Sequence, residues 1–190
     1  MNRRSLGVAA VSAMVWLNAS ASNSSNSSYI AATGASKLEF TGTQAGADFT
    51  GTFHDYTATV ELDPQALDRA RIDVQIRLAS VDTKDKDRDD SIRGRDIFDA
   101  ARFPIAHYVT RSIAKSGSGY TAIGSLTLRG ITKDVPITFQ FAPSNGSAKL
   151  VGTAQLRRLD FGASQGDWKS TEWIADPVRI SFALALTARQ

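Results

Sequence analysis

The sequence predicts an all-β domain, an antiparallel barrel that is closed or nearly closed and carries one short helical insert at about residues 82–103. Three observations support this. Apolar and polar residues alternate with the period of two that marks half-buried strands over most of the chain after residue 37. Short connections rich in Gly and Pro favour antiparallel neighbours. The charged segment 82–103 breaks the alternation. So many antiparallel strands must form two sheets or close on themselves, and we expect closure.

The amino terminus has the three regions of a secretory signal peptide. Arg3 and Arg4 precede an apolar run over 6–17, and small residues at 19–21 provide a cleavage site. The apolar run is shorter than the roughly 20 residues that a membrane-spanning helix needs. We therefore expect residues 1–21 to direct export, by the Sec route rather than the twin-arginine route, and to be removed.

A flexible leader over 22–36 is expected next, because residues 22–28 are Ser and Asn only. The remainder, 37–188, has the length of one domain. Removal of 1–21 takes away two arginines, which lowers the formal net charge from +3 to +1, so the charge gives no support to nucleic-acid binding. The chain has no cysteine, so neither a disulfide nor a cysteine-linked lipid anchor can form.

Nine strands are predicted, at 37–42, 48–53, 56–62, 70–78, 105–113, 120–128, 135–141, 149–157 and 178–187. The alternation is clearest in 70–78, where Ile72, Val74, Ile76 and Leu78 share one face. The opposite face of that strand is polar and should contact water.

The insert at 82–103 is charged in its first half. Ile92, Ile97 and Phe98 follow at roughly helical spacings, which predicts one or two short helical turns between 87 and 101. Pro104 then forces an extended exit. To bury its apolar side chains, the insert must lie across a sheet face or a barrel mouth, where it would form the rim of a cavity.

The acidic residues of the insert do not form a calcium loop. Asp85, Asp87 and Asp89 match the first ligand positions of such a loop, but Asp90 stands where glycine is required and basic residues neutralise the segment. A solvated charged turn without metal is the better interpretation.

Catalytic machinery is not evident in the sequence either. The two histidines, His54 and His107, lie outside any hydrolase motif, and a thiol nucleophile is lacking. We therefore expect a binding protein rather than an enzyme, with no cofactor beyond a bound ligand.

Three blocks in the chain resemble the signature of the YceI-like family. They are Arg88-Asp89 with Arg93, Asp96-x-Phe98-Asp99 and Phe103-Pro104; then Gly124-x-Leu126-Thr127-Leu128-Arg129-Gly130-Ile131-Thr132-Lys133; then Arg158-Leu159-Asp160-Phe161-Gly162. The resemblance covers essentially all of 37–187. In one departure, Ser91 stands where the family commonly has histidine, so a head-group role for that histidine is absent. The segments 40–44 and 166–173 further resemble members that accompany cytochrome b-type membrane proteins.

The resemblance implies a lipocalin-like barrel, exported to the bacterial periplasm, whose interior holds a polyisoprenoid or similar long-chain amphiphile, with an isoprenoid quinone as one form. It also implies a cytochrome b-type membrane protein as a partner, while a homodimer is left open. The alternative is a solid barrel that acts as a structural or adaptor protein through its surface, because an eight-stranded barrel can be filled by side chains or hold a ligand.

The candidate ligand-binding residues fall into three groups. Apolar side chains for the tail are Phe49, Ile76, Leu78, Phe98, Phe139, Phe161 and Phe182; Trp168 and Trp173 are placed near a mouth; and Arg88, Arg93 and Arg158 are candidates for an oxygen-rich head group. Ordinary core packing remains open for each aromatic residue. Ion pairs that pin the insert to the barrel remain open for the arginines.

Overall fold

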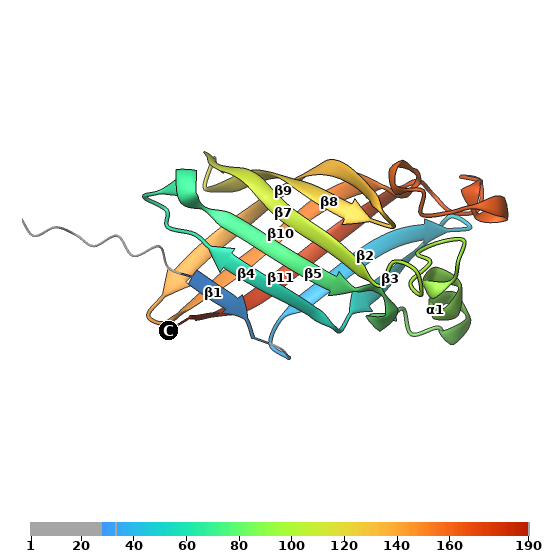
Figure 1. Ribbon diagram of the computed structural model, residues 1–190, viewed down its shortest axis with the longest axis horizontal. Helices are drawn as coiled ribbons and strands as arrows, with labels where there is room; N and C mark the ends of the chain where they lie inside the picture. The colour runs from blue at the N-terminus through green and yellow to red at the C-terminus, as the bar shows by residue number, and fades with distance from the viewer. Residues whose placement is uncertain (1–27, 33, 190) are drawn as a thin grey trace, which may run out of the picture.

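The computed structural model describes residues 28–32 and 34–189, which fold into an elongated antiparallel barrel (Figure 1). The predicted signal peptide 1–21 and the first part of the leader, 22–27, lie outside the described residues. Among the helices that the structure describes, none is long and apolar enough to cross a membrane.

The nine predicted strands are confirmed, with small shifts at their ends. In chain order the strands are β1 (Ser28–Ala31), β2 (Lys37–Gln44), β3 (Ala47–Phe53), β4 (Tyr56–Glu61), β5 (Arg71–Arg77), β6 (Val81–Asp82), β7 (Ile105–Ser116), β8 (Gly119–Leu128), β9 (Ile131–Ser144), β10 (Ser147–Arg157) and β11 (Pro177–Ala188). Short 3-10 helices are η1 (Leu67–Arg69), η2 (Leu78–Ser80), η3 (Arg158–Phe161) and η4 (Gly166–Lys169).

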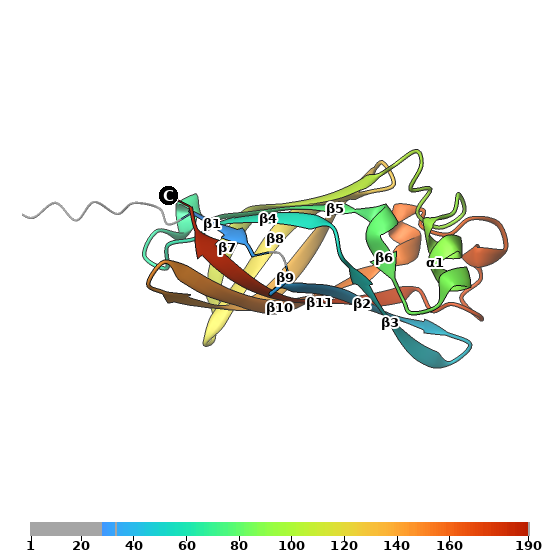
Figure 2. The same ribbon diagram turned by 90° about the horizontal axis from the view of Figure 1, so that it is seen from below.

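The barrel closes as eight strands within the described residues. Three of the eight positions in the barrel wall are each occupied by two short strands, one after the other. Strands β1 and β2 share the first position, because both pair with β11. Strands β4 and β3 share the second, because they pair with β1 and β2, and strands β5 and β6 share the third, because they pair with β4 and β3. The interruptions let the barrel wall bend at one end, where β2 and β3 extend beyond the rest (Figure 2).

Strand β1 corrects the predicted leader at 22–36, since Ser28–Ala31 is part of the barrel wall. Tyr29 lies opposite Ala188 of β11 and Val60 of β4, and so bridges the first and last parts of the sheet. Its side chain is buried and meets Phe141 edge to face, with ring centroids 5.8 Å apart. The residues before this strand are Ser and Asn only, so the local composition predicts a flexible leader and gives no sign of the strand.

The helical insert is confirmed and lies at the end of the barrel opposite the carboxyl terminus (Figure 1). Its helix α1 spans Lys86–Arg93 and begins at Asp85, whose side chain accepts a hydrogen bond from the Arg88 backbone N–H (3.1 Å). Asp89 is buried and accepts hydrogen bonds from the Thr83 N–H (2.8 Å) and hydroxyl (2.7 Å). These bonds fix α1 against the end of the barrel.

The other end of the barrel is filled. Tyr120 and Phe139 stack with centroids 5.4 Å apart, one layer from the Tyr29–Phe141 pair. We call these four residues the aromatic plug. Its contacts give the closed end of the barrel a solid core.

Candidate functional site

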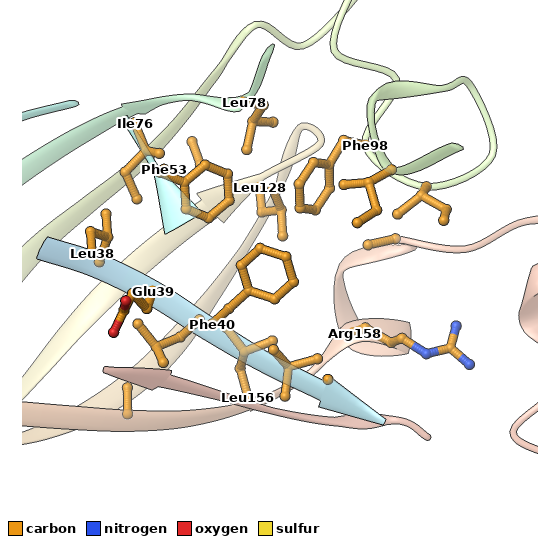
Figure 3. Close-up of a pocket in the computed structure, with 18 of the residues that line it drawn as sticks. Leu38, Glu39, Phe40, Phe53, Ile76, Leu78, Phe98, Leu128, Leu156 and Arg158 are labelled. Carbon is orange, nitrogen blue, oxygen red and sulfur yellow. The ribbon is translucent and has the colours of Figure 1, made fainter. Parts of the chain in front are cut away.

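A cavity of about 470 Å³ occupies the half of the barrel nearest α1, a size typical of small-molecule sites. The inward faces of β2 to β5 and of β7 to β11 form its walls, and α1 with residues 163–175 surrounds its mouth. The rings of Phe40, Phe53 and Phe98 converge on it from the wall and the insert (Figure 3). The walls are therefore almost wholly aliphatic and aromatic.

The period-two pattern explains these walls. Ile72, Val74, Ile76 and Leu78 all line the cavity, as the alternation in this segment requires. Their neighbours point outward, and one of them, Asp73, binds His107 on the outer surface (2.8 Å).

Six of the predicted tail or mouth residues line the cavity, namely Phe49, Ile76, Leu78, Phe98, Trp168 and Phe182. Sequence reasoning missed other lining residues whose place in the alternation could have identified them: Leu38, Phe40, Phe53, Tyr108, Leu126, Leu128, Leu156 and Ile180. It also missed Gln44 at the mouth, for which the local sequence carries no signal.

Three predicted site residues are not part of the cavity lining, although Trp173 belongs to the 163–175 segment that surrounds the mouth. Phe139 belongs to the aromatic plug, where it is 4% exposed. Phe161 is buried in the turn η3. Trp173 is 68% exposed, and its carbonyl accepts a hydrogen bond from Ala45 in the β2–β3 turn (2.7 Å). Alternation along a strand gives the direction of a side chain but not its depth along the barrel axis.

Arg88, a predicted head-group residue, is among the residues at the mouth. Its Nε donates to the Gln44 side-chain oxygen (3.3 Å), its guanidinium carbon lies 4.6 Å from the centre of the Phe49 ring, and its Nη2 is 3.4 Å from an Asp85 carboxylate oxygen. Arg88 thus joins α1 to the end of β2 and β3. Because its hydrogen bond to Gln44 is long and its other contacts are an ion pair and a cation–π contact, Arg88 can exchange partners.

Arg158 lines the inner end of the mouth, but its guanidinium points away from the apolar side chains (Figure 3). It donates to the backbone oxygens of Trp168 (2.8 Å), Ser170 (3.1 Å), Ile174 (2.6 Å) and Ala175 (3.0 Å). Burial lowers the pKa of Arg158. With these four acceptors, Arg158 holds the 163–175 loop rather than a ligand.

Arg93, the third predicted head-group residue, lies outside the cavity lining. Its Nη2 donates to the Val81 carbonyl (2.6 Å) and its Nε to the Ala79 carbonyl (3.0 Å), while Asp90 lies 3.2 Å from its Nη1. This pattern matches the pinning role that the sequence left open: Arg93 ties α1 to the chain that enters it.

Tyr108 forms part of the cavity floor. Its hydroxyl donates to the Val135 carbonyl (3.1 Å), and its ring lies so close to Gly124 that a Cβ there would be 2.4 Å from the ring. Burial raises the pKa of Tyr108 well above its usual range. The glycine therefore makes room for a ring that crosses the barrel interior.

Within the described residues no three His, Cys, Asp or Glu side chains gather as they would around a metal ion. His54 contacts Asp82 (3.1 Å) and is mostly exposed. The chemistry that the arrangement supports is therefore apolar enclosure with a polar rim.

The family model described as the YceI-like domain matches residues 29–186. The chain belongs to the YceI-like family. This match starts at β1 and ends within β11, so it includes every strand of the barrel.

Solved structures share the YceI-like barrel. BcnA of Burkholderia cenocepacia is 30% identical, with a TM-score of 0.78 over 82% of this chain and 98% of that chain. A YceI protein of Campylobacter jejuni is 24% identical (TM-score 0.63, covering 74% and 84%). A polyisoprenoid-binding domain of Saccharophagus degradans is 16% identical (TM-score 0.63, covering 85% and 98%). At these last two identities the likeness shows the fold alone.

Among curated proteins, a UPF0312 protein of Yersinia pestis is 36% identical over 87 residues, which are 46% of this chain and 45% of that protein. A UPF0312 protein of Photorhabdus laumondii is 35% identical over 85 residues. The matched segment thus spans about half the length of these relatives.

Proposed function

We propose that this YceI-like protein binds one long-chain amphiphile, an isoprenoid lipid, with the tail in the cavity and the head group at the mouth. The observation that carries the proposal is the apolar cavity of about 470 Å³ that opens beneath α1. The polyisoprenoid-binding domain of Saccharophagus degradans, which shares the fold, supports an isoprenoid as the tail. A filled barrel that acts only through its surface does not account for this cavity.

The energetics favour a tail of this kind. Each buried CH2 group contributes about 0.8 kcal/mol, so ten carbons contribute on the order of 8 kcal/mol before the cost of association. The cavity walls offer few polar groups that a tail would leave without partners. Binding therefore requires no catalytic group.

The rim determines the head-group chemistry. Arg88 reaches the mouth from α1 and can donate two parallel hydrogen bonds to a phosphate or carboxylate, or one to a quinone carbonyl. Asp85 and Asp87 also lie at the rim, so a head group with a hydroxyl could donate to them. We assign the head group to Arg88 because four of the five N–H groups of Arg158 already donate to backbone oxygens.

We further propose that the protein works in the periplasm, after removal of 1–21, and that an isoprenoid quinone is a candidate cargo. Association with a cytochrome b-type membrane protein and formation of a homodimer remain predictions from the sequence.

The test is native mass spectrometry of protein purified gently from a bacterial periplasm, followed by organic extraction of any bound molecule. A single adduct with an isoprenoid mass is expected. A clean protein mass that persists when prenyl alcohols, prenyl phosphates and quinones are offered would contradict the proposal.

A further inference from the structure

The cavity ends partway along the barrel, and the residues at its end determine what fits. Among the described residues, the deepest lining side chains form a ring around the barrel interior: Ile72, Tyr108, Ile137, Leu150 and Leu184. The next inward residues of β9 and β11 are Phe139 and Leu186, which are both buried. The transition from hollow to filled barrel therefore takes place within one side-chain layer.

Phe139 lies next to the lining of the cavity, in the first filled layer. It pairs with Gly152 of β10, and Gly152 pairs with Phe182 of β11. A Cβ at Gly152 would lie 2.6 Å from both Phe139 Cβ and Phe182 Cζ. Since Phe182 lines the cavity, Phe139 abuts a cavity wall directly. Tyr120 stacks on Phe139 and holds its ring in place.

From this arrangement we infer that Phe139 sets an upper limit on the length of tail that the cavity buries, so that affinity stops rising at about three isoprene units. The inference rests on the proposed function. A volume of about 470 Å³, at roughly 30 Å³ for each water-sized group, holds on the order of 15 carbon atoms. A longer tail that enters end first leaves its remaining units in water at the mouth, so they add no burial.

The experiment offers the full-length protein an equimolar mixture of prenyl alcohols of two, three, four and eight isoprene units, and reads the bound species by native mass spectrometry. The three-unit alcohol is expected to exceed the two-unit alcohol by about tenfold or more, because the added unit is buried. The four-unit and eight-unit alcohols should gain less than about twofold over it. Occupancy that keeps rising to eight units would overturn the length limit. Failure of every alcohol to bind would instead count against the proposed function.

Variants test the plug itself. Phe139→Ala should move the limit toward four units, because it opens space below Phe182. The control Tyr29→Ala removes a ring of the plug whose strand neighbours, Val60 and Ala188, lie outside the cavity lining, and should leave the limit at three units. Equal lengthening in both variants, or in neither while both remain folded by circular dichroism, would overturn the role of Phe139.

A second variant keeps the test decisive if Phe139→Ala does not fold. Leu150→Phe adds volume at the cavity floor without emptying the plug, and should shorten the limit to two units. A three-unit preference that persists in a folded Leu150→Phe protein would contradict the inference.

Discussion

Arg88 and Arg93 lie five residues apart on one helix, yet their partners differ. Arg88 holds a side-chain amide and an aromatic ring at the mouth, whereas Arg93 holds the carbonyls of Ala79 and Val81. The sequence block that contains both could not separate these roles, because the acceptors lie in other segments. Position along α1 alone decides which arginine faces the cavity.

Arg88→Met is therefore expected to weaken binding of farnesyl phosphate by about tenfold, the loss of one charge-assisted hydrogen bond. Binding of farnesol should change little, since its tail contacts remain. Isothermal titration with both ligands measures the difference.

Arg93→Met is the matched variant, with the opposite signature. It should lower the free energy of unfolding by about 1–2 kcal/mol, because two backbone carbonyls lose a donor, and should leave the affinity for farnesyl phosphate unchanged. A loss of affinity in Arg93→Met at constant stability would restore its predicted head-group role.

Arg158→Met should lower the free energy of unfolding by about 3 kcal/mol, since four backbone oxygens near a buried site lose their donor. Urea denaturation measures this loss, with the exposed Arg179→Met as a control that should change little. If Arg158→Met kept its stability and lost only ligand affinity, Arg158 would be a head-group ligand after all.

At the scale of elements, α1 is held across the mouth by the buried Asp89 carboxylate. Asp89→Ala leaves the Thr83 N–H and hydroxyl without their acceptor, and should cost about 2 kcal/mol of stability. Because α1 covers the cavity, bound lipid should also dissociate faster. Hydrogen exchange of 83–93 and lipid off-rates measure both effects. The exposed Asp90→Ala should leave them nearly unchanged; equal effects in the two variants would argue against the anchoring role of Asp89.

The junction between η3 and β11 predicts an acid dependence. Burial raises the pKa of Asp176. Hydrogen bonds donated by the Leu159 N–H (3.0 Å) and the Arg157 side chain (2.6 Å) together outweigh this effect and hold the pKa of Asp176 below its usual value. Because the folded-state pKa lies below the unfolded one, the stabilisation is present above about pH 4 and is lost as the pH falls through the folded pKa. The urea concentration at the midpoint of unfolding should fall as the pH is lowered below about 4, and it should fall less steeply in Asp176→Asn. Parallel curves for the two proteins would rule Asp176 out as a source.

Elements with strong alternation were predictable, and β1 was not. The long strands of the barrel contain four or five alternating apolar residues, which predict them. Strand β1 has only Tyr29 and Ala31, after a polar run. Its stability comes from pairing with β4 and β11, which are distant in sequence. Local pattern cannot report such a tertiary contribution.

At the scale of the whole molecule, one barrel combines a hollow half and a filled half. The sequence could predict a barrel but left open whether it was hollow, because that choice depends on which inward residues share a layer. The packing of side chains across the interior decides it: the Phe139 ring stacks on Tyr120 and lies outside the cavity lining, so it belongs to the plug. The filled half can stabilise the fold while the hollow half stays open to a ligand.

The central claim is that the tail occupies the hollow half, and the most direct measurement compares two insertions of the same ring. Ala154 lines the cavity on β10, whereas Ala183 on the neighbouring strand β11 is exposed. Farnesol stoichiometry by native mass spectrometry should fall from one per chain toward zero in Ala154→Phe and stay at one in Ala183→Phe. Full farnesol occupancy in a folded Ala154→Phe protein would show that the tail binds elsewhere.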